Sequence, residues 1–484
     1  MLPRALAIAA ATVLFLAALE PAAAFDSVDD ERVWALEGVA VIDVRTGDVL
    51  PDRTIVVRRG IIRSIAPTST ANVPDEAIVV EQRGAYVVPG LWDMHVHIRG
   101  GSRLEGANER WLAQYLGFGV TAVRDAGGDL PDAVLRWKAA IESGEIPGPR
   151  IFTSLQKIDG PDGAWGGSIP VAASEDIAPA LEELAVGGAD FIKIYDGSIS
   201  PRVFLEVLAE AERRGLRTAA HIPLSVPFED AVDAGLDSVE HAFHLVKAAH
   251  PRDRAESRRF ERDGIPLEFE PFFVAVAELG AKADDAQARR IFRKMAARGT
   301  ALTPTLYIRT VWNGIRDYDT YQDDPRLADV PTEILATFEP GLDVLANRTA
   351  AERASDERLE AMSLHLTRLA AEEGVTILAG SDTGVSNPFA YPGDSLHHEL
   401  EALVDAGLSP LQALQAATIE AATWLGKADE LGTIEEGKAA DLLVLGGNPL
   451  VDIRNTRAIV AVVQQGVYFD SGELAALRRG RPRE

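Results

Sequence analysis

Strand-like and helical stretches alternate along the middle of this chain, and that alternation limits the folds open to it. Eight short runs rich in apolar and β-branched residues are each followed by a helical or loop stretch, at residues 87–97, 120–125, 150–155, 189–195, 217–221, 237–243, 300–306 and 375–382. The clearest helical stretches are 131–143, 177–186, 201–214 and 351–373. Eight such units predict an α/β fold, a (β/α)8 TIM barrel with parallel strands inside and helices outside.

The alternative fold for this pattern is an open, doubly wound sheet. That fold would carry a glycine-rich phosphate-binding turn after its first strand. The segment His95-Val96-His97 occupies that place instead, which favours the barrel. Two long stretches, 246–298 and 307–349, exceed what a barrel needs. We expect them to cover the C-terminal face of the barrel and to shape a substrate pocket.

Short strand-like segments stand at both ends of the chain, and each set is too small to form a core of its own. Residues 34–82 and 428–484 contain several β-branched runs between turn signals. We expect both ends to pack together as one small, discontinuous β-sandwich domain. This predicts a sandwich of residues 25–88 and 428–484 and a barrel of residues 89–427, with Pro89-Gly90 at the joint.

The first residues have the pattern of a signal peptide. Arg4 gives the positive start, residues 5–19 are apolar, and Ala22-Ala23-Ala24 matches a cleavage site of small residues. The apolar run of about 15 residues is shorter than the roughly 20 needed to span a bilayer. We therefore expect residues 1–24 to be a signal peptide cleaved near Ala24, with no membrane anchor. The mature protein would be periplasmic or extracellular.

The composition of the chain restricts the partners that it can bind and the catalytic groups that it can use. The formal net charge is -26, and an acidic surface repels nucleic acid and anionic membranes. The chain has no cysteine, which excludes disulfides, thiolate metal sites and cysteine nucleophiles. A metal ion would need histidine, a carboxylate or a modified lysine. A small molecule or dipeptide is the expected partner, and the sequence is compatible with a homo-oligomer.

Residues able to bind a metal recur where the predicted strands end, which is where barrel enzymes place their catalytic groups. The spacing of His95 and His97 puts both imidazoles on one face of a strand. Three or four ligands hold one catalytic Zn²⁺, whereas six suit a pair of metal ions. The six are His95 and His97 from strand one, Lys193 from strand four, His221 from strand five, His241 from strand six and Asp382 from strand eight.

Lys193 is unusual because apolar Ile192 and Ile194 flank it on a predicted buried strand. A buried ammonium is costly and tends to lose its proton. The neutral amine can react with CO₂ to form a carbamate, which can bridge two cations as a carboxylate does. In the alternative interpretation, Lys193 stays an ammonium paired with Asp196 or Glu240.

Four further residues are candidates for binding substrate. Tyr195 lies two residues past Lys193 on the same strand face, and His244 follows His241 by three residues. Tyr307 and Arg309 come after the seventh strand, where they could bind a substrate carboxylate. The structural alternatives are packing for Tyr195, a loop turned aside for His244 and a solvated loop for Arg309.

The motifs at these positions resemble those of the metal-dependent amidohydrolase superfamily. They are PGLWDMHVH, GADFIKIY, AAHIP, AGLDSVEHAFH, LAGSDTG and LGTIEEGKAADLLVL. The chain is most similar to the branch related to imidazolonepropionase, which contains exported Xaa-Pro and carboxypeptidase-like dipeptidases and ochratoxin-type amide hydrolases. In that branch the strand-four lysine is carboxylated. Imidazolonepropionase itself is mononuclear and lacks that lysine, so Lys193 and the signal peptide speak against that enzyme.

The resemblance implies a role for each candidate ligand. His95, His97 and Asp382 would bind the more buried metal, His221 and His241 the second, and N6-carboxylated Lys193 would bridge the two. The cofactors would be two divalent ions, by default Zn²⁺. Asp382 would act as the general base and then the general acid. The implied reaction is hydrolysis of an amide in a dipeptide (Xaa-Pro or other) or N-acyl amino acid by a metal-activated hydroxide.

Three other functions remain open on the same scaffold. An activated hydroxide also attacks esters, so a lactonase or ester hydrolase is one. A cyclic-amide hydrolase like imidazolonepropionase is another. A non-catalytic binding homologue is the third, but such a protein is expected to have lost ligands, and all six are present here.

Overall fold

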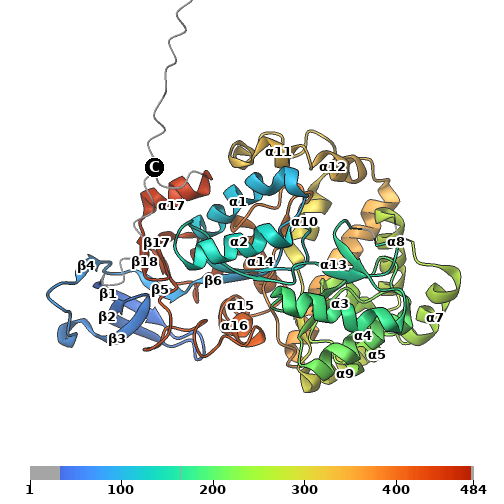
Figure 1. Ribbon diagram of the computed structural model, residues 1–484, viewed down its shortest axis with the longest axis horizontal. Helices are drawn as coiled ribbons and strands as arrows, with labels where there is room; N and C mark the ends of the chain where they lie inside the picture. The colour runs from blue at the N-terminus through green and yellow to red at the C-terminus, as the bar shows by residue number, and fades with distance from the viewer. Residues whose placement is uncertain (1–32, 164, 267, 481–484) are drawn as a thin grey trace, which may run out of the picture.

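The computed structural model describes residues 33–163, 165–266 and 268–480. The predicted signal peptide, residues 1–24, lies outside these ranges. The described chain has a β-sheet at one end, on the left in Figure 1, and a larger body in which helices surround further strands. None of the helices in the described ranges has the length and apolar character of a membrane-crossing segment.

Strands from both ends of the chain form one eight-stranded sheet, the end sheet. The strand order is β18–β17–β16–β5–β1–β2–β3, with β4 beside β1. The pairing of the two chain ends is therefore observed, whereas the two-layer sandwich and the domain boundaries stay predictions. The strands are β1 (Val33–Ile42), β2 (Val49–Arg58), β3 (Ile61–Pro67), β4 (Ile78–Glu81), β5 (Tyr86–Pro89), β16 (Leu442–Leu445), β17 (Ile459–Gln464) and β18 (Val467–Phe469).

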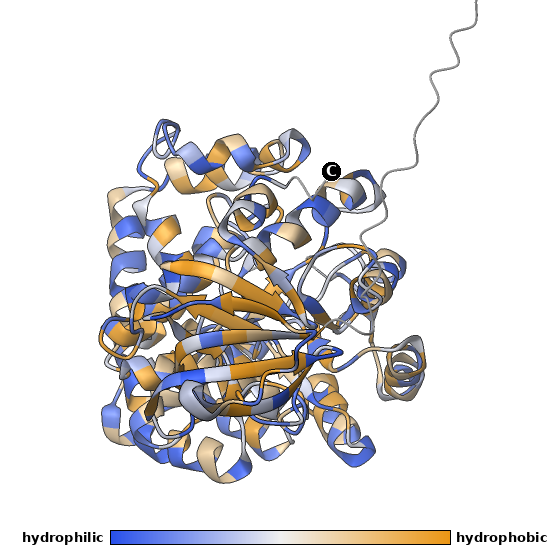
Figure 2. Cartoon of the chain, turned by 90° about the vertical axis from the view of Figure 1, so that its left-hand side faces the viewer, coloured by the Kyte–Doolittle hydropathy of each residue, from blue (hydrophilic) through white to orange (hydrophobic). Residues whose placement is uncertain are grey.

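Apolar side chains from both chain ends hold the end sheet together. Leu36 and Ile55 from the first strands share one buried cluster with Val444 and Val463 from the last strands. Figure 2 shows this end of the molecule face on, with largely apolar strands. The indole nitrogen of Trp34 donates to the carbonyl of Gly466 at 2.8 Å, across 432 residues of sequence. Burial of apolar surface thus ties the two ends of the chain to each other.

The larger body contains two sheets in which every described strand pair is parallel. One sheet has the order β15–β6–β7–β8 and the other has the order β10–β9–β11–β12–β13–β14. The strands of the first are β6 (Leu91–His97), β7 (Val120–Asp125), β8 (Arg150–Thr153) and β15 (Thr383–Gly384). Those of the second are β9 (Lys157–Asp159), β10 (Ser168–Pro170), β11 (Ile192–Ile194), β12 (Thr218–Ala220), β13 (Ser238–Glu240) and β14 (Ala301–Thr303).

Backbone hydrogen bonds connect these two sheets on both sides. On one side, the amide of Asp190, just before β11, donates to the carbonyl of Thr153 in β8 at 2.8 Å. On the other side, the predicted eighth strand lies between β14 and β6. The amide of Leu302 donates to the carbonyl of Thr376, and the amide of Met94 donates to that of Ala379. The parallel α/β class is therefore confirmed.

The predicted eighth strand, residues 375–382, is not a regular strand. The described pairing consists of the bridge between Leu302 and Ile377 and the two-residue strand β15. Asp382 has a left-handed φ of 57°, which is costly for a residue with a side chain and interrupts a ladder. The predicted strand is therefore interrupted at Asp382, directly before β15.

Helices follow the parallel strands as predicted. Pro201 occupies the first turn of α4 (Pro201–Arg214), and the hydroxyl of Ser200 accepts from the amide of Val203, so this helix begins where its sequence signals predict. The other helices around the strands are α1 (Glu105–Gly117), α2 (Pro131–Glu142), α3 (Ser174–Gly187), α5 (Phe228–Asp233), α9 (Asp285–Arg298), α13 (Ala350–Glu372), α14 (Asp394–Asp405), α15 (Pro410–Ala416) and α16 (Ile419–Trp424). Helix α17 (Ser471–Arg478) packs against α1.

The two long stretches after β13 and β14 fold mainly into helices. The first forms α6 (Leu245–Ala249), α7 (Asp253–Asp263) and α8 (Phe269–Gly280) before α9. The second forms α10 (Leu306–Gly314), α11 (Thr332–Leu335) and α12 (Glu339–Ala346). Residues from both stretches line the cavity described next, as predicted.

Candidate metal centre and substrate cavity

A cavity of about 580 Å³ opens where the parallel strands end. Residues at or just beyond the C-terminal ends of β6, β11, β12, β13 and β14 reach its wall, and they meet residues of α8, α10 and α12 there. Its lining includes these residues of the predicted site: His97, Tyr195, His221, His241, His244, Arg309 and Asp382. His95 and Lys193 have no exposed surface and are absent from the lining.

His95, His97 and Asp382 form the first group of candidate ligands. The Nε2 atoms of His95 and His97 are 3.3 Å apart, because alternate residues of β6 share a face. Asp382 Oδ1 lies 3.2 Å from His97 Nε2 and 3.8 Å from His95 Nε2. Three ligand atoms this close have the chemistry and spacing to hold one divalent ion.

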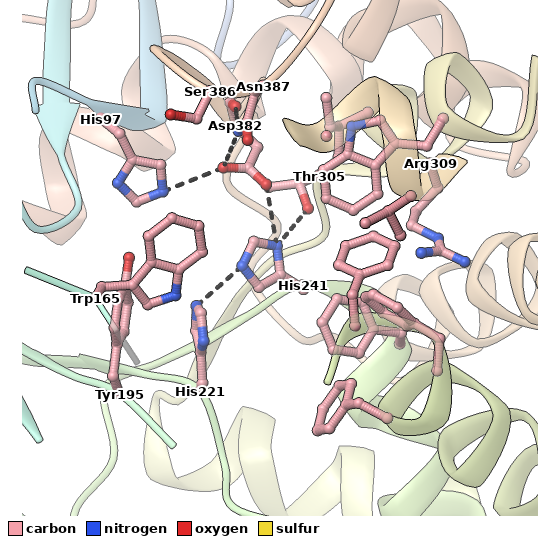
Figure 3. Close-up of a pocket in the computed structure, with 18 of the residues that line it drawn as sticks. His97, Trp165, Tyr195, His221, His241, Thr305, Arg309, Asp382, Ser386 and Asn387 are labelled. Atoms are coloured by element: carbon pink, nitrogen blue, oxygen red, sulfur yellow. Dashed lines mark hydrogen bonds and ion pairs between the residues drawn. The ribbon is translucent and has the colours of Figure 1, made fainter. Parts of the chain in front are cut away.

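His221 and His241 form the second group, at the ends of β12 and β13. Their Nε2 atoms are 3.0 Å apart. Asp382 lies between the two groups, since its Oδ2 is 4.0 Å from His241 Nδ1 while its Oδ1 faces His97 (Figure 3). One carboxylate therefore reaches both histidine pairs.

The backbone at three of these strand ends is in the left-handed region. His241 has a φ of 66°, Thr305 of 47° and Asp382 of 57°. Such conformations cost energy in residues with a side chain and persist where the surroundings impose them, often at active sites. Here they turn the side chains toward one another, and the hydroxyl of Thr305 lies 2.7 Å from His241 Nδ1.

The four histidines are held as neutral imidazoles. Burial is the largest cause and lowers the pKa of each well below its ordinary value, and the nearby ammonium of Lys193 lowers all four further. A neutral imidazole is the form that binds a metal ion. The four residues are His95, His97, His221 and His241.

Lys193 lies in β11 with its ammonium nitrogen buried and without a hydrogen-bond partner among the described residues. Both acids proposed as its partners are engaged elsewhere. Glu240 accepts from Arg124 and Ser238 and lies 2.5 Å from His95 Nδ1. Asp196 Oδ1 lies 3.2 Å from His221 Nδ1. Burial lowers the pKa of Lys193 to about 8, which makes the neutral, reactive amine accessible near neutral pH.

Two acids orient the histidine rings from behind. Glu240 and Asp196 each face the Nδ1 atom of a histidine, so that Nε2 of His95 and of His221 points to the centre. Metal-binding histidines commonly have such a partner, which fixes the ring and its tautomer. Arg124, also fully buried, donates to Glu240 at 2.7 Å and keeps that carboxylate charged.

Tyr195 and His244 lie where a substrate contact is expected. The Tyr195 ring stacks on His221 with centroids 4.5 Å apart. His244 is 1% exposed, and both of its ring nitrogens lack a hydrogen-bond partner among the described residues. Burial lowers the pKa of His244 to about 3. Both residues line the cavity, which agrees with their predicted position and leaves their role a prediction.

The structure places Tyr307 away from the cavity. Its ring stacks on His398 with centroids 4.5 Å apart, and it is absent from the cavity lining, whereas Ile308, Arg309 and Trp312 belong to it. Tyr307 and Arg309 are two residues apart on a helix, so they face nearly opposite sides. The predicted pairing of these two residues around one substrate group is therefore not what the geometry shows.

Arg309 lines the cavity, but its charge is already paired. It donates to Asp356 at 2.7 Å, and Arg348 donates to the same carboxylate at 2.6 Å. The guanidinium also lies 4.2 Å from the centroid of Phe273. Figure 3 shows Arg309 beyond the aromatic rings, away from His97 and Asp382. This position is remote from the candidate ligands.

The cavity residues that the sequence analysis did not single out include Arg99, Trp165 and Asn387. Arg99 follows His97 by two residues, and a charged residue so close to a buried strand was a signal that could have found it. Trp165 lies in a loop and Asn387 in a turn, and no sequence pattern marks either. A cluster of further aromatic side chains lines the cavity: Phe243, Phe269, Phe272, Phe273 and Trp312.

Comparisons with known proteins place the chain in a family. Residues 86–468 match the model of the amidohydrolase family. The chain is similar to imidazolonepropionase of Pseudomonas fluorescens, with 24% identity over 85% of this chain and 92% of that protein. It is also similar to ochratoxinase of Aspergillus niger, with 24% identity over 92% of this chain and 88% of that protein.

A solved structure shares the fold. A Xaa-Pro dipeptidase with bound methionine in its active site superposes with a TM-score of 0.65 at 22% identity, over 90% of this chain and 100% of that one. The family match spans most of the sequence and includes every candidate ligand named above. The chain belongs to the amidohydrolase family, and it is a hydrolase that acts on carbon–nitrogen bonds.

Proposed function

We propose that this protein is a binuclear amidohydrolase that cleaves the amide bond of a dipeptide, Xaa-Pro or other, or of an N-acyl amino acid. One observation carries the proposal: two close pairs of neutral histidines flank a single carboxylate, Asp382, in one cavity. The names of the relatives support an amide substrate, since one is a Xaa-Pro dipeptidase.

The residues present fit two divalent ions, by default Zn²⁺. His95, His97 and Asp382 would hold one ion, and His221 and His241 the other. The unpartnered buried nitrogen of Lys193 supports a carbamate bridge. In that reaction the neutral amine forms an N–C bond to CO₂ and releases a proton, and the product is a carboxylate able to bind both ions. A carbamate replaces an uncompensated buried cation with an anion that has partners.

When bound, the two ions would polarise the substrate carbonyl and lower the pKa of a water molecule. The protein supplies the proton transfers and the positioning. Asp382 lies between both ligand groups, where it can accept a proton from the attacking water and deliver it to the leaving amine. Glu240 and Asp196 hold the rings of His95 and His221. The cavity surrounds the substrate with mostly apolar side chains, which exclude water.

We also infer the architecture that presents these groups. The hydrogen bonds that connect the two parallel sheets on both sides support a closed (β/α)8 barrel, in which residues 375–382 are the eighth strand. The end sheet supports a separate β-sandwich domain of residues 25–88 and 428–484 beside a barrel of residues 89–427. Cleavage near Ala24 and export to the periplasm or the medium complete this proposal.

The test combines metal analysis with a substrate panel. The purified protein should contain close to two divalent ions per chain, and chelation should abolish activity that added Zn²⁺, Mn²⁺ or Co²⁺ restores. The panel contains dipeptides, N-acyl amino acids, lactones and imidazolone propionate. Turnover of lactones with no turnover of amides would contradict the proposal, and so would a chain that hydrolyses amides with no metal bound.

A further inference from the structure

Arg99 is a buried cation with no ion-pair partner among the described residues. It is 8% exposed. Its Nε donates to the carbonyl of Val385 at 3.2 Å, and its Nη2 donates to Asn387 Oδ1 at 3.4 Å. Both acceptors are neutral, so no carboxylate is hydrogen-bonded to the guanidinium, and the carboxylates of Asp125 and Asp382 act on it only through space. A buried guanidinium in this state favours an anionic ligand, especially a carboxylate, which its planar fork can bind with two hydrogen bonds.

Arg99 reaches the cavity together with an aromatic neighbour, Trp165. Trp165 covers the guanidinium at 4.3 Å from the ring centroid, and both residues line the cavity. Stacking on an aromatic ring fixes a guanidinium without neutralising it. The other arginine of the cavity lining, Arg309, differs in this respect, because Asp356 neutralises it.

Asn387 connects Arg99 to the candidate metal centre. Its Nδ2 donates to the backbone carbonyl of Asp382 at 2.5 Å and lies 3.3 Å from the Oδ1 atom. Its Oδ1 accepts from Arg99. The side-chain amide of Asn387 therefore places Arg99 beside Asp382 without a direct ion pair. An anion bound by Arg99 would lie next to the substrate bond that is hydrolysed at the candidate metal centre.

Another part of the cavity lining is aromatic. Phe272 and Phe273 pack edge to face at 5.3 Å, and Phe269 contacts both Phe273 and Trp312. The cavity lining thus combines the Arg99 guanidinium with an aromatic side, against which the ion-paired Arg309 also packs. A substrate that spans it needs an anionic group at one end and an apolar group at the other.

We propose that Arg99, stacked on Trp165 and held by Asn387, is the subsite that binds the free carboxylate of the substrate. The aromatic side receives a large apolar group on the acyl part. This inference rests on the proposed amide hydrolysis and adds the chemical class to it: substrates with a carboxylate on the leaving amine and an apolar acyl group.

The test compares matched substrates. The dipeptide or N-acyl amino acid that the panel shows to be cleaved fastest is assayed against its C-terminal carboxamide, which has the same size but no negative charge. We expect the wild-type kcat/KM to favour the carboxylate by roughly 10–100-fold, the range of a charged hydrogen-bonded pair. In Arg99→Gln the ratio should fall to within about threefold, mainly through KM for the carboxylate. Arg99→Lys should keep part of the preference.

The control is Arg103→Gln. Arg103 is exposed, four residues further along in the 3₁₀ turn Ser102–Leu104, and this variant should keep the wild-type ratio. Metal content should be the same in all variants, which separates a subsite role from damage to His97.

Equal cleavage of acid and carboxamide by the wild type, or an unchanged ratio in Arg99→Gln, would overturn the inference and leave the proposed function intact. Failure of every amide in the panel would instead overturn the proposed function. If Arg99→Gln does not fold, the wild-type ratio and Arg99→Lys decide.

Discussion

At the scale of single residues, Lys193 is the residue on which the two-metal proposal depends most. Lys193→Ala removes the carbamate, so we expect loss of most activity and of at least one metal ion per chain, measured by elemental analysis and by kcat. A metal content that stays at two ions per chain would exclude a bridging role.

A matched control for Lys193 is Lys157, another buried lysine. Its ammonium donates to the backbone carbonyls of Gly128 and Gly166, so it has partners where Lys193 has none. Lys157→Met should lower the free energy of unfolding, because two carbonyls lose a donor. It should leave the metal content at two. Loss of metal in both lysine variants would indicate a general structural effect.

Asp382 has a second predicted role, as the proton carrier. Asp382→Asn keeps the size and one oxygen ligand of the side chain but removes the group that accepts a proton. We expect most of the metal to remain bound, while kcat falls by a factor on the order of 10²–10⁴, the usual contribution of general acid–base catalysis. A variant that keeps metal and full kcat would exclude this role.

The sequence predicted that the candidate ligands lie close together, but it placed Tyr307 wrongly and did not single out Arg99, Trp165 or Asn387. The position of a residue at a strand end follows from the position of the strand. The pattern alone was therefore enough to place the residues His95, His97, His221, His241 and Asp382. Tyr307 could not, because the direction of a side chain at a helix start depends on the exact first residue of α10. Arg99, Trp165 and Asn387 could not be placed because turns and loops bring them together.

At the scale of elements, the start of helix α10 contains an unusual cap. Glu399, in α14, accepts from the backbone amide of Tyr307 at 2.7 Å and is fully buried. Burial raises the pKa of Glu399 from 4.5 to about 8. At neutral pH the carboxyl group is therefore largely protonated, and its remaining oxygen, Oε1, has no partner among the described residues.

This cap predicts a pH dependence of stability. Because the pKa of Glu399 is higher in the folded chain than in the unfolded one, the folded state binds the proton more tightly. This contribution to the free energy of unfolding is complete below pH 4.5 and is lost as the pH rises through about 8, by at most about 1.4 kcal/mol per pH unit. Glu399→Gln cannot titrate, so urea unfolding of this variant should lack that part of the decline. Parallel curves for the two proteins between pH 5 and pH 9 would contradict the assignment.

The order of elements was largely predictable, and their exact pairing was not. Helix α4 has the bounds that its serine, proline and glycine signals indicated. The strand predicted at 150–155 ends as β8 at Thr153, and Leu155, with a φ of 60°, separates it from β9, which was not predicted. The strand predicted at 375–382 is irregular for a similar reason. Hydrophobic runs indicate where a strand lies. A residue with a left-handed φ inside such a run does not change the alternation of apolar and polar residues, so the sequence pattern does not show where the strand is interrupted.

At the scale of the whole molecule, Gly90 joins the end sheet to the parallel sheets, between β5 and β6. Its amide donates to the carbonyl of Asp441 at 2.9 Å. A Cβ at this position would lie 2.2 Å from Thr121 Oγ1 and 2.4 Å from its Cγ2. Gly90→Ala should therefore lower the free energy of unfolding by about 1–3 kcal/mol, the usual cost of overpacking, measured by urea denaturation.

Gly106 is the control for that substitution. It lies in α1, and a Cβ there would meet nothing within 4 Å. Gly106→Ala should be neutral or should stabilise the protein by up to about 1 kcal/mol. Adding Thr121→Ala to Gly90→Ala removes the two closest atoms and should recover part of the lost stability. Equal effects of both glycine substitutions would show that the contact with Thr121 is not the cause.

The two halves of the end sheet are synthesised at different times. Strands β1 to β5 leave the ribosome first, whereas their partners β16 to β18 follow about 350 residues later. At about 5–20 residues per second this delay is roughly 20–70 s. Throughout that time the early strands present an unpaired edge and an apolar face, the features that drive aggregation. A chain that stops before Leu442 keeps them exposed, so an incomplete product is recognisable to chaperones and proteases even when every candidate metal ligand has already been made.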